Sequence, residues 1–359
     1  MVRSKIDRGP LQWRAWFQTR IRTLSPAYFS VVMATGILSV GSELNGWRVV
    51  SNFFLVLSFI FFISFLLLYG FRWIRFASYM RADFIHPERS FGFLTLVAAT
   101  DVLAIRLNGT HELWLMVLLA LMGLLSWMAL LYMQFAYLIF ENVRPIAEVV
   151  NGSWLLAPVA TQSLAIVGTL VATHTGEERE WILVASFALW ALGILFYLLF
   201  IVFILYRFFF CGVRQEDLAP SYWINMGAMA IATVAGAHLA SPDLESSFLR
   251  LVHSFVVALT VMMWAWGSWW FPLLLIMGGW KYRSLRKLLH YETGLWSIIF
   301  PLGMYAVSLF FISQFPGLHF LSRFVATFLI FAIVAWCFTL LLWGSATAQA
   351  LKRLFQSGH

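Results

Sequence analysis

The sequence is poor in charged residues, which make up 11% of its 359 residues, whereas hydrophobic residues make up 62%. A typical soluble domain carries roughly 25% charged residues. This chain therefore lacks the polar surface that a water-soluble protein of its length needs, and we predict an integral membrane protein. The formal net charge of +8 is assigned to loops at one membrane face, not to nucleic-acid binding.

The sequence also has few cysteines and no recognisable catalytic motif. Its two cysteines, Cys211 and Cys337, exclude a disulfide framework and a Cys-x-x-Cys metal site. The motifs of zinc proteases, serine hydrolases and P-loop ATPases are missing. We therefore expect no enzyme activity, no metal, no cofactor and no ATP-driven pump. The basic N-terminal segment lacks the apolar stretch of a cleavable signal peptide.

Long apolar runs are what the sequence does have, and they predict ten transmembrane helices. Crossing the hydrocarbon core of a bilayer takes about 20 apolar residues. We expect a basic tail over residues 1–25, a ten-helix domain over 26–345 and a second tail over 346–359. The predicted spans cover residues 26–43, 49–71, 90–107, 112–135, 148–172, 180–206, 220–240, 248–280, 293–314 and 322–345.

The distribution of Lys and Arg sets the predicted orientation, because cytoplasmic loops carry an excess of both residues. With both termini in the cytoplasm, all but five of the 24 basic residues fall on that side. The exceptions are Arg48, Arg106, Arg179, Arg250 and Arg323. We therefore predict a multi-pass protein of the plasma membrane, which is the inner membrane in a bacterium, with cytoplasmic tails.

The predicted spans alternate in character. Even-numbered spans carry bulky side chains, as in FFLVLSFIFFISFLLLYGF over 53–71, whereas odd-numbered spans carry small and hydroxyl residues, as in VVMATGILSVG over 31–41. Small residues let helix backbones approach closely in lipid. We therefore expect the odd-numbered spans inside the bundle and the even-numbered spans facing lipid.

An Ala-Thr pair recurs in the odd-numbered spans at intervals of 61 to 72 residues. Such a repeat predicts a helical hairpin used five times around an axial path, although a tight bundle without a pore is also compatible with it. The hydroxyl and amide groups of these spans are the candidate pore-lining groups for an anion. They belong to Thr35, Thr100, Thr161, Gln162 and Thr233.

The fifth repeat departs from the other four. Continuing the interval beyond Thr233 leads to Ile299-Phe300-Pro301, where a bulky side chain stands in place of the Ala-Thr pair. If these positions line an axis, Phe300 intrudes into it, and a hydrophobic constriction can gate a pore by excluding water. Ordinary core packing is the alternative in a chain with 35 Phe. Pro301 removes a backbone donor and is expected to kink its helix.

Ionisable side chains within the predicted spans are rare, and such residues are often functional. Asp101 is either a proton site, which would favour a coupled carrier, or a structural carboxylate bonded to a neighbouring helix. Arg106 and Arg250, near outer span ends, either concentrate anions at an outer mouth or extend to the membrane interface.

Five segments carry a resemblance to a known family: SPAYFSVVMATGILSVG, NGSWLLAPVATQSLA, PSYWINMGAMAIATVAGA, WGSWWFPLLLIMGGW and TGLWSIIFPLGMYAVS, in this order. They resemble the tellurite-resistance and C4-dicarboxylate transporter family of bacterial TehA, plant guard-cell slow anion channels and fungal malate permeases. The resemblance covers about residues 26–345. It implies five hairpins in a quasi-five-fold arrangement, a homotrimer, kinked inner helices matching Pro158 and Pro301, and a pore closed by Phe300.

The resemblance leaves the substrate open, because family members pass chloride and nitrate, malate or sulfite. Asp101 is not part of the family's pore pattern, so proton coupling also stays open. Our first hypothesis is passage of small anions through a Phe-gated channel. The second is a proton-coupled transporter of C4-dicarboxylates, sulfite or tellurite, and the third is a membrane scaffold that transports nothing.

Overall fold

The computed structural model describes residues 9–108, 112–244, 246–283 and 289–356, and within these ranges the chain forms helices and no strand. Nine helices of this described part are long and apolar enough to cross a membrane. The chain is therefore an all-helical integral membrane protein, as the sequence predicts.

Five helices with small side chains form the interior of the bundle, and we call them the inner helices. They are α2 (Ser30–Leu44), α6 (Thr95–Leu107), α9 (Leu156–Ala172), α11 (Ile224–Leu239) and α14 (Trp296–Ile312). A short 3-10 turn precedes each of them. These turns are η1 (Pro26–Phe29), η2 (Phe91–Leu94), η3 (Gly152–Leu155), η5 (Pro220–Trp223) and η6 (Thr293–Leu295).

Five longer, bulkier helices surround them, and we call these the outer helices. They are α3 (Arg48–Arg75), α7 (Leu113–Phe140), α10 (Arg179–Phe210), α12 (Ser247–Lys281) and α15 (Val325–Gln356). Inner helices among the nine candidate spans are 78% to 89% buried, against 22% to 39% for the outer helices. This contrast confirms the predicted alternation of inner and lipid-facing spans.

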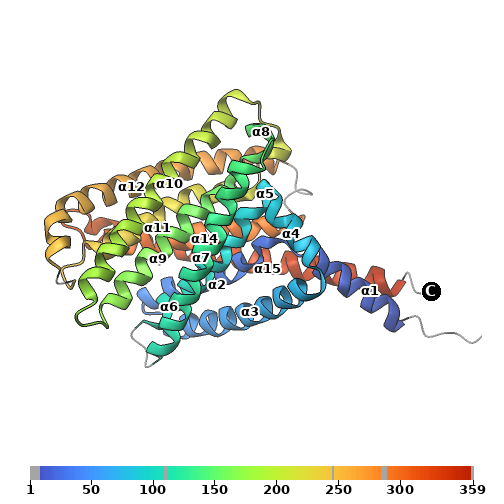
Figure 1. The fold of residues 1–359 in the computed structure, drawn as a ribbon, viewed down its shortest axis with the longest axis horizontal. Coiled ribbons are helices and arrows are strands. Elements are labelled where there is room, and N and C mark those ends of the chain that lie inside the picture. The colour runs from blue at the N-terminus through green and yellow to red at the C-terminus, as the bar shows by residue number, and fades with distance from the viewer. Residues whose placement is uncertain (1–8, 109–111, 245, 284–288, 357–359) are drawn as a thin grey trace, which may run out of the picture.

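The remaining elements are short or peripheral. α4 (Ala77–Ile85) and α5 (Pro87–Ser90) connect α3 to η2, and α8 (Ile146–Val149) precedes η3. α1 (Gly9–Arg22) contacts α15 and extends with it away from the bundle (Figure 1). η4 (Gln215–Asp217) and η7 (His319–Phe324) lie in loops. Most outer helices are longer than predicted, and α15 continues well beyond residue 345.

The inner helices contact one another in a closed circuit: α2 with α6, α6 with α9, α9 with α11, α11 with α14, and α14 with α2. Their 3-10 turns contact one another in the same cyclic order. All five helices therefore start at the same end of the bundle and run parallel.

Glycines mark where the inner helices approach each other most closely. A Cβ atom on Gly36 would lie 2.6 Å from Cγ1 of Val102, and one on Gly303 would lie 2.8 Å from Cγ2 of Ile37. Both glycines stand ten residues after the first residue of their 3-10 turns. The contacts of α2 with α6 and of α14 with α2 therefore have a glycine at the same depth.

Each inner helix also packs against the outer helix that follows it in the chain, and most outer helices bond to the next inner helix. In three cases the donor is a tryptophan indole. The pairs are Trp127 with Oγ1 of Thr161 (2.9 Å), Trp190 with the carbonyl oxygen of Ala232 (2.9 Å) and Trp336 with Oγ1 of Thr35 (3.0 Å). These bonds satisfy polar groups that lipid cannot.

A substitution at Gly152 tests the close contact between η3 and η5, the turns at the starts of α9 and α11. A Cβ atom there would lie 2.5 Å from the carbonyl oxygen of Ser221, and backbone atoms cannot move aside as a flexible side chain can. We expect Gly152→Ala to lower the thermal unfolding midpoint of the purified protein by on the order of 5 °C.

Gly279→Ala is the matched control, because Gly279 lies on the exposed side of α12 and a Cβ atom there would meet nothing within 4 Å. This substitution should leave the midpoint unchanged or raise it, since Ala favours a helix over Gly. Equal midpoints for both variants would contradict the close contact.

Candidate functional site

A cavity of about 220 Å³ lies between the inner helices and is lined by residues of all five; we call it the axial cavity. One layer of its wall consists of the residues that stand fourteen positions after the first residue of each 3-10 turn. They are Val40, Ile105, Ile166, Val234 and Val307. The repeat thus places a β-branched side chain at one depth on every inner helix, and this layer of the wall is apolar.

Phe300 lies beneath the axial cavity, towards the N-terminal ends of the inner helices. On α14 the cavity is lined by Met304, Val307 and Phe311, and Phe300 precedes Met304 by one turn on the same face. Its side chain is only 2% exposed. Counted from the 3-10 turns, the residues at its depth on the other inner helices are Met33, Ala98, Val159 and Gly227.

This register corrects one detail of the predicted repeat. Thr35, Thr100 and Thr161 stand nine residues after the first residue of their 3-10 turns, whereas Thr233 stands thirteen residues after its own. Thr233 is therefore displaced by about one helical turn. Phe300 corresponds to the residue just before the Ala-Thr pair, and not to the pair itself.

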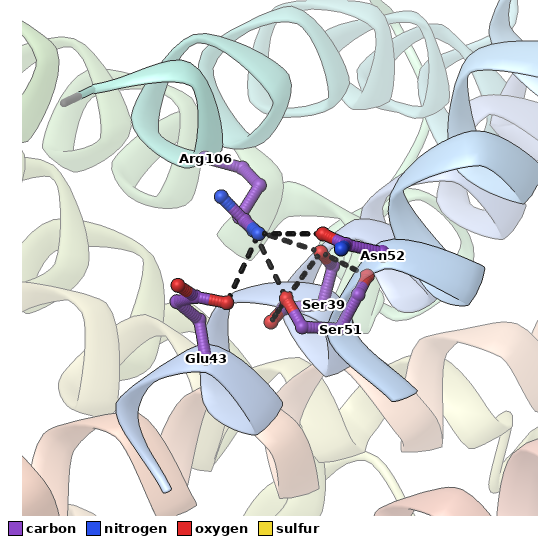
Figure 2. Close-up of polar contacts among 5 residues, drawn as sticks. All are labelled: Ser39, Glu43, Ser51, Asn52 and Arg106. Carbon is purple, nitrogen blue, oxygen red and sulfur yellow. Dashed lines mark hydrogen bonds and ion pairs between the residues drawn. The ribbon is translucent and has the colours of Figure 1, made fainter. Parts of the chain in front are cut away.

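Arg106 lines the axial cavity in the last turn of α6, at the end of the cavity that we call the entrance, and is held by residues of α2 and α3 (Figure 2). Its Nε atom donates to Oγ of Ser39 and to Oγ of Ser51, both at 3.1 Å. Its Nη2 atom donates to Oε2 of Glu43 at 3.0 Å and to Oδ1 of Asn52 at 3.3 Å. The guanidinium group is thus fixed at the entrance by four side chains.

The two serines that hold Arg106 are fully buried and join α2 to α3. Ser39 Oγ donates to the carbonyl oxygen of Ser51, and Ser51 Oγ donates to the carbonyl oxygen of Ser39, each at 2.8 Å. The Arg106 side chain is 11% exposed and that of Glu43 is 42% exposed. The entrance therefore has a rigid, buried positive group and a more accessible negative one.

A second cavity of about 890 Å³ adjoins the axial cavity on the side of α11 and α14. Leu170, His238 and Phe311 line both cavities. The His238 and Phe311 rings lie 4.6 Å apart between their centroids. A wider space therefore adjoins the axial cavity at the C-terminal ends of the inner helices, and the His238 and Phe311 rings lie between the two.

The structure directs three of the predicted pore-lining residues towards outer helices. Thr35 and Thr161 accept the tryptophan indoles described above, and Nε2 of Gln162 donates to the carbonyl oxygen of Trp190 at 2.9 Å. Thr35 and Thr161 each precede a wall residue of the axial cavity by five positions, which is about 140° around a helix. This angle explains why they point elsewhere.

The other two threonines bond within their own helices. Thr100 Oγ1 donates to the carbonyl oxygen of Val97 at 2.7 Å, and Thr233 Oγ1 donates to that of Met229 at 2.8 Å. None of the five predicted residues is among the residues that line the axial cavity in the described part of the chain. A contribution to the path beneath the cavity stays a prediction for them.

Asp101 is fully buried at the contact between α6 and α9 and does not line the axial cavity. Its Oδ2 atom accepts a hydrogen bond from Oγ of Ser163 at 2.5 Å, and its Oδ1 atom, which faces Gly123 of α7, has no hydrogen-bond partner among the described residues. The hydrogen bond to Ser163 on α9 is what we expect if Asp101 is a structural carboxylate bonded to a neighbouring helix. The proton-site interpretation stays a prediction.

The two prolines occupy different environments. Pro301 lies inside α14, and a Cβ atom on Gly227 would lie 2.9 Å from Cγ of its ring, so glycine at 227 makes room for the proline. Pro158 lies in the first turn of α9, which directly follows the 3-10 turn η3. The kinks expected at both positions stay predictions.

The wall residues and the two serines around Arg106 are not among those predicted from the sequence. A signal for the wall exists, because a β-branched residue recurs at a fixed distance from the start of each repeat. It becomes readable only when the repeats are aligned by their 3-10 turns. The serine pair has no comparable signal, since it depends on how α2 meets α3.

Comparisons with known proteins identify the family and several relatives of this chain. The sequence model described as "voltage-dependent anion channel" matches residues 23–343. Two uncharacterized transporters of Methanocaldococcus jannaschii are 27% and 28% identical over 298 and 299 residues, which cover 81% and 80% of this chain and 85% and 83% of theirs. An uncharacterized membrane protein of Mycobacterium tuberculosis is 44% identical over 96 residues, which is 26% of this chain and 48% of that protein.

Thr161→Val tests whether this threonine joins two helices or lines a path. The substitution removes the acceptor of the buried Trp127 indole, and an unsatisfied buried donor costs about 1–3 kcal/mol. Thr233→Val is the control, because its described bond is to a carbonyl of its own helix. We expect a lower thermal midpoint for Thr161→Val than for Thr233→Val. If Thr161→Val instead leaves the midpoint unchanged and alters the anion conductance of a protein that also carries Phe300→Ala, the residue lines the path.

Proposed function

Because the chain belongs to the voltage-dependent anion channel family, we propose that it passes small anions along the axis of the inner helices and that Phe300 is the gate. The observation that carries this proposal is the axial cavity, which residues of all five inner helices line and beneath which Phe300 lies. No other inner helix has an aromatic residue at this depth.

The proposal includes ten membrane-spanning helices arranged as five hairpins with quasi-five-fold symmetry. The closed circuit of inner helices supports it, as does the equal depth of the wall residues on each of them. The tenth span is α11, which is short and rich in Ala and Gly and falls outside the nine candidate spans of the described residues. Assembly as a homotrimer rests on the family resemblance alone.

The apolar wall suits conduction because it offers no tight binding site. An anion that enters the axial cavity meets Val and Ile side chains and no ring of fixed charges. Passage requires binding weak enough for the ion to leave, and an apolar constriction closes by excluding water. With both termini in the cytoplasm, as we propose, the axial cavity opens towards the outside.

A proton-coupled transporter of C4-dicarboxylates, sulfite or tellurite is the second candidate. The observation that favours it is Asp101, whose Oδ1 atom is buried without a described hydrogen-bond partner. Intramembrane carboxyl groups are common in proton relays. Asp101 does not line the axial cavity, which favours the channel, because a proton site in direct contact with the substrate would lie on the path.

Phe300→Ala tests the gate directly. Removing the ring should open the apolar constriction, so we expect purified wild-type protein in planar bilayers to be nearly silent in chloride or nitrate and the variant to conduct with anion selectivity. Phe62→Ala is the matched control, because Phe62 is also buried but lies on the outer helix α3. A silent, folded Phe300→Ala protein would contradict the gate.

Asp101→Asn separates the two candidates. For a channel, flux through the Phe300→Ala protein should be insensitive to a pH gradient, and adding Asp101→Asn should preserve it. For a coupled carrier, uptake of malate or sulfite into proteoliposomes should follow an inward proton gradient and disappear in Asp101→Asn. Gradient-driven uptake with this loss would overturn the channel proposal.

A further inference from the structure

Arg106 is the single Lys or Arg residue among the described residues that line the axial cavity. It is also mostly buried, with 11% of its side chain exposed. A charge at this depth costs free energy unless polar groups hold it, and here four side chains do so (Figure 2). Its position is therefore specified by the structure, unlike that of a flexible surface arginine.

The hydrogen bonds to the described residues leave the Nη1 group of the guanidinium free, and the edge formed by Nη1 and Nη2 becomes available to a ligand when Glu43 leaves Nη2. Ser39 and Ser51 bind Nε, and Glu43 and Asn52 bind Nη2, while Nη1 makes no hydrogen bond to another described residue. The serines are locked by their reciprocal bonds, so the orientation of the guanidinium plane is fixed in advance. A preorganised donor group loses little entropy when it binds a ligand.

Glu43 occupies the place that an anionic ligand would take. Its carboxylate contacts Nη2 of Arg106 at 3.0 Å, and its side chain is 42% exposed. Water reaches the Glu43 carboxylate, which weakens its attraction to the arginine. An anion arriving at the entrance can therefore displace Glu43 from the arginine at modest concentration.

We propose that the Arg106 guanidinium group is a binding site for small planar oxyanions at the entrance of the axial path, and that Glu43 competes with them for it. The planar fork of a guanidinium group matches nitrate and carboxylate groups better than it matches a spherical ion. The site thus selects oxyanions over chloride before they reach the apolar wall. This inference rests on the proposed function, because it assigns a role to the entrance of the same path.

The test uses the conducting Phe300→Ala protein as the parent and measures the nitrate concentration that gives half-maximal conductance. Adding Glu43→Gln removes the competing charge and should lower this concentration roughly 2- to 5-fold. Adding Arg106→Gln removes the site and should raise it about 10-fold or more. Arg106→Lys keeps the positive charge but removes the planar guanidinium group, so a protein that carries it should no longer prefer nitrate over chloride.

Arg250→Gln is the matched control. Arg250 lies near the same end of the bundle on the outer helix α12, is exposed and does not line the axial cavity. Its removal should change neither the half-saturating concentration nor the preference for nitrate. The opposite shifts expected for Glu43→Gln and Arg106→Gln would not arise from a loss of stability.

The outcomes separate this inference from the proposed function. If Phe300→Ala conducts but the Glu43 and Arg106 variants match it, the entrance site is wrong and the channel proposal stands. If Phe300→Ala is silent, the site is tested by the thermal unfolding midpoint of wild-type protein. Nitrate should raise this midpoint more than a bulky sulfonate does at equal ionic strength. Arg106→Gln should abolish that stabilisation and Glu43→Gln should enhance it. The absence of any nitrate-dependent stabilisation would overturn the site.

Discussion

The close approach of the five inner helices is the constraint on which the rest of the structure depends. Lipid offers no hydrophobic force between helices, so they associate through packing of small residues. Glycines at matching depths let α2 lie close to α6, at Gly36, and α14 lie close to α2, at Gly303. Once the circuit closes, the side chains at its centre must fill the axis or leave it open. Val and Ile do not reach across, and the axial cavity results.

The directions of the polar side chains follow from the same close packing of the inner helices. An inner helix that turns apolar residues to the axis must turn its hydroxyl groups to other helices, where they need partners. Oγ1 of Thr161 donates to the carbonyl oxygen of Ala157 and accepts from the Trp127 indole, so both of its capacities are used. Thr35 does the same with Val31 and Trp336. At Thr35 and Thr161 the recurring threonine thus joins two hairpins.

Much of the architecture is readable in the sequence. Hydrophobic length gives the outer helices, and the small-residue pattern separates inner from outer, because both depend on composition alone. The direction of side chains is harder to predict. Thr161 and Ile166 lie on one helix, about 140° apart, and the sequence does not say which of them faces the axis. Arg106 illustrates a further limit, since its serine partners come from two other helices. Such a site depends on tertiary contacts that local patterns do not encode.

The central claim is that anions travel along the axis past the wall residues of α14. The most direct test places a cysteine at Val307, a wall residue of the axial cavity, in the conducting Phe300→Ala protein with Cys211 and Cys337 replaced by serine. A negatively charged methanethiosulfonate reagent is then added while the current is recorded. The account predicts a rapid loss of current, whereas a cysteine at the exposed Val334 of α15 should have no effect. The account would be contradicted if residue 307 is shown to be labelled and the current nevertheless persists.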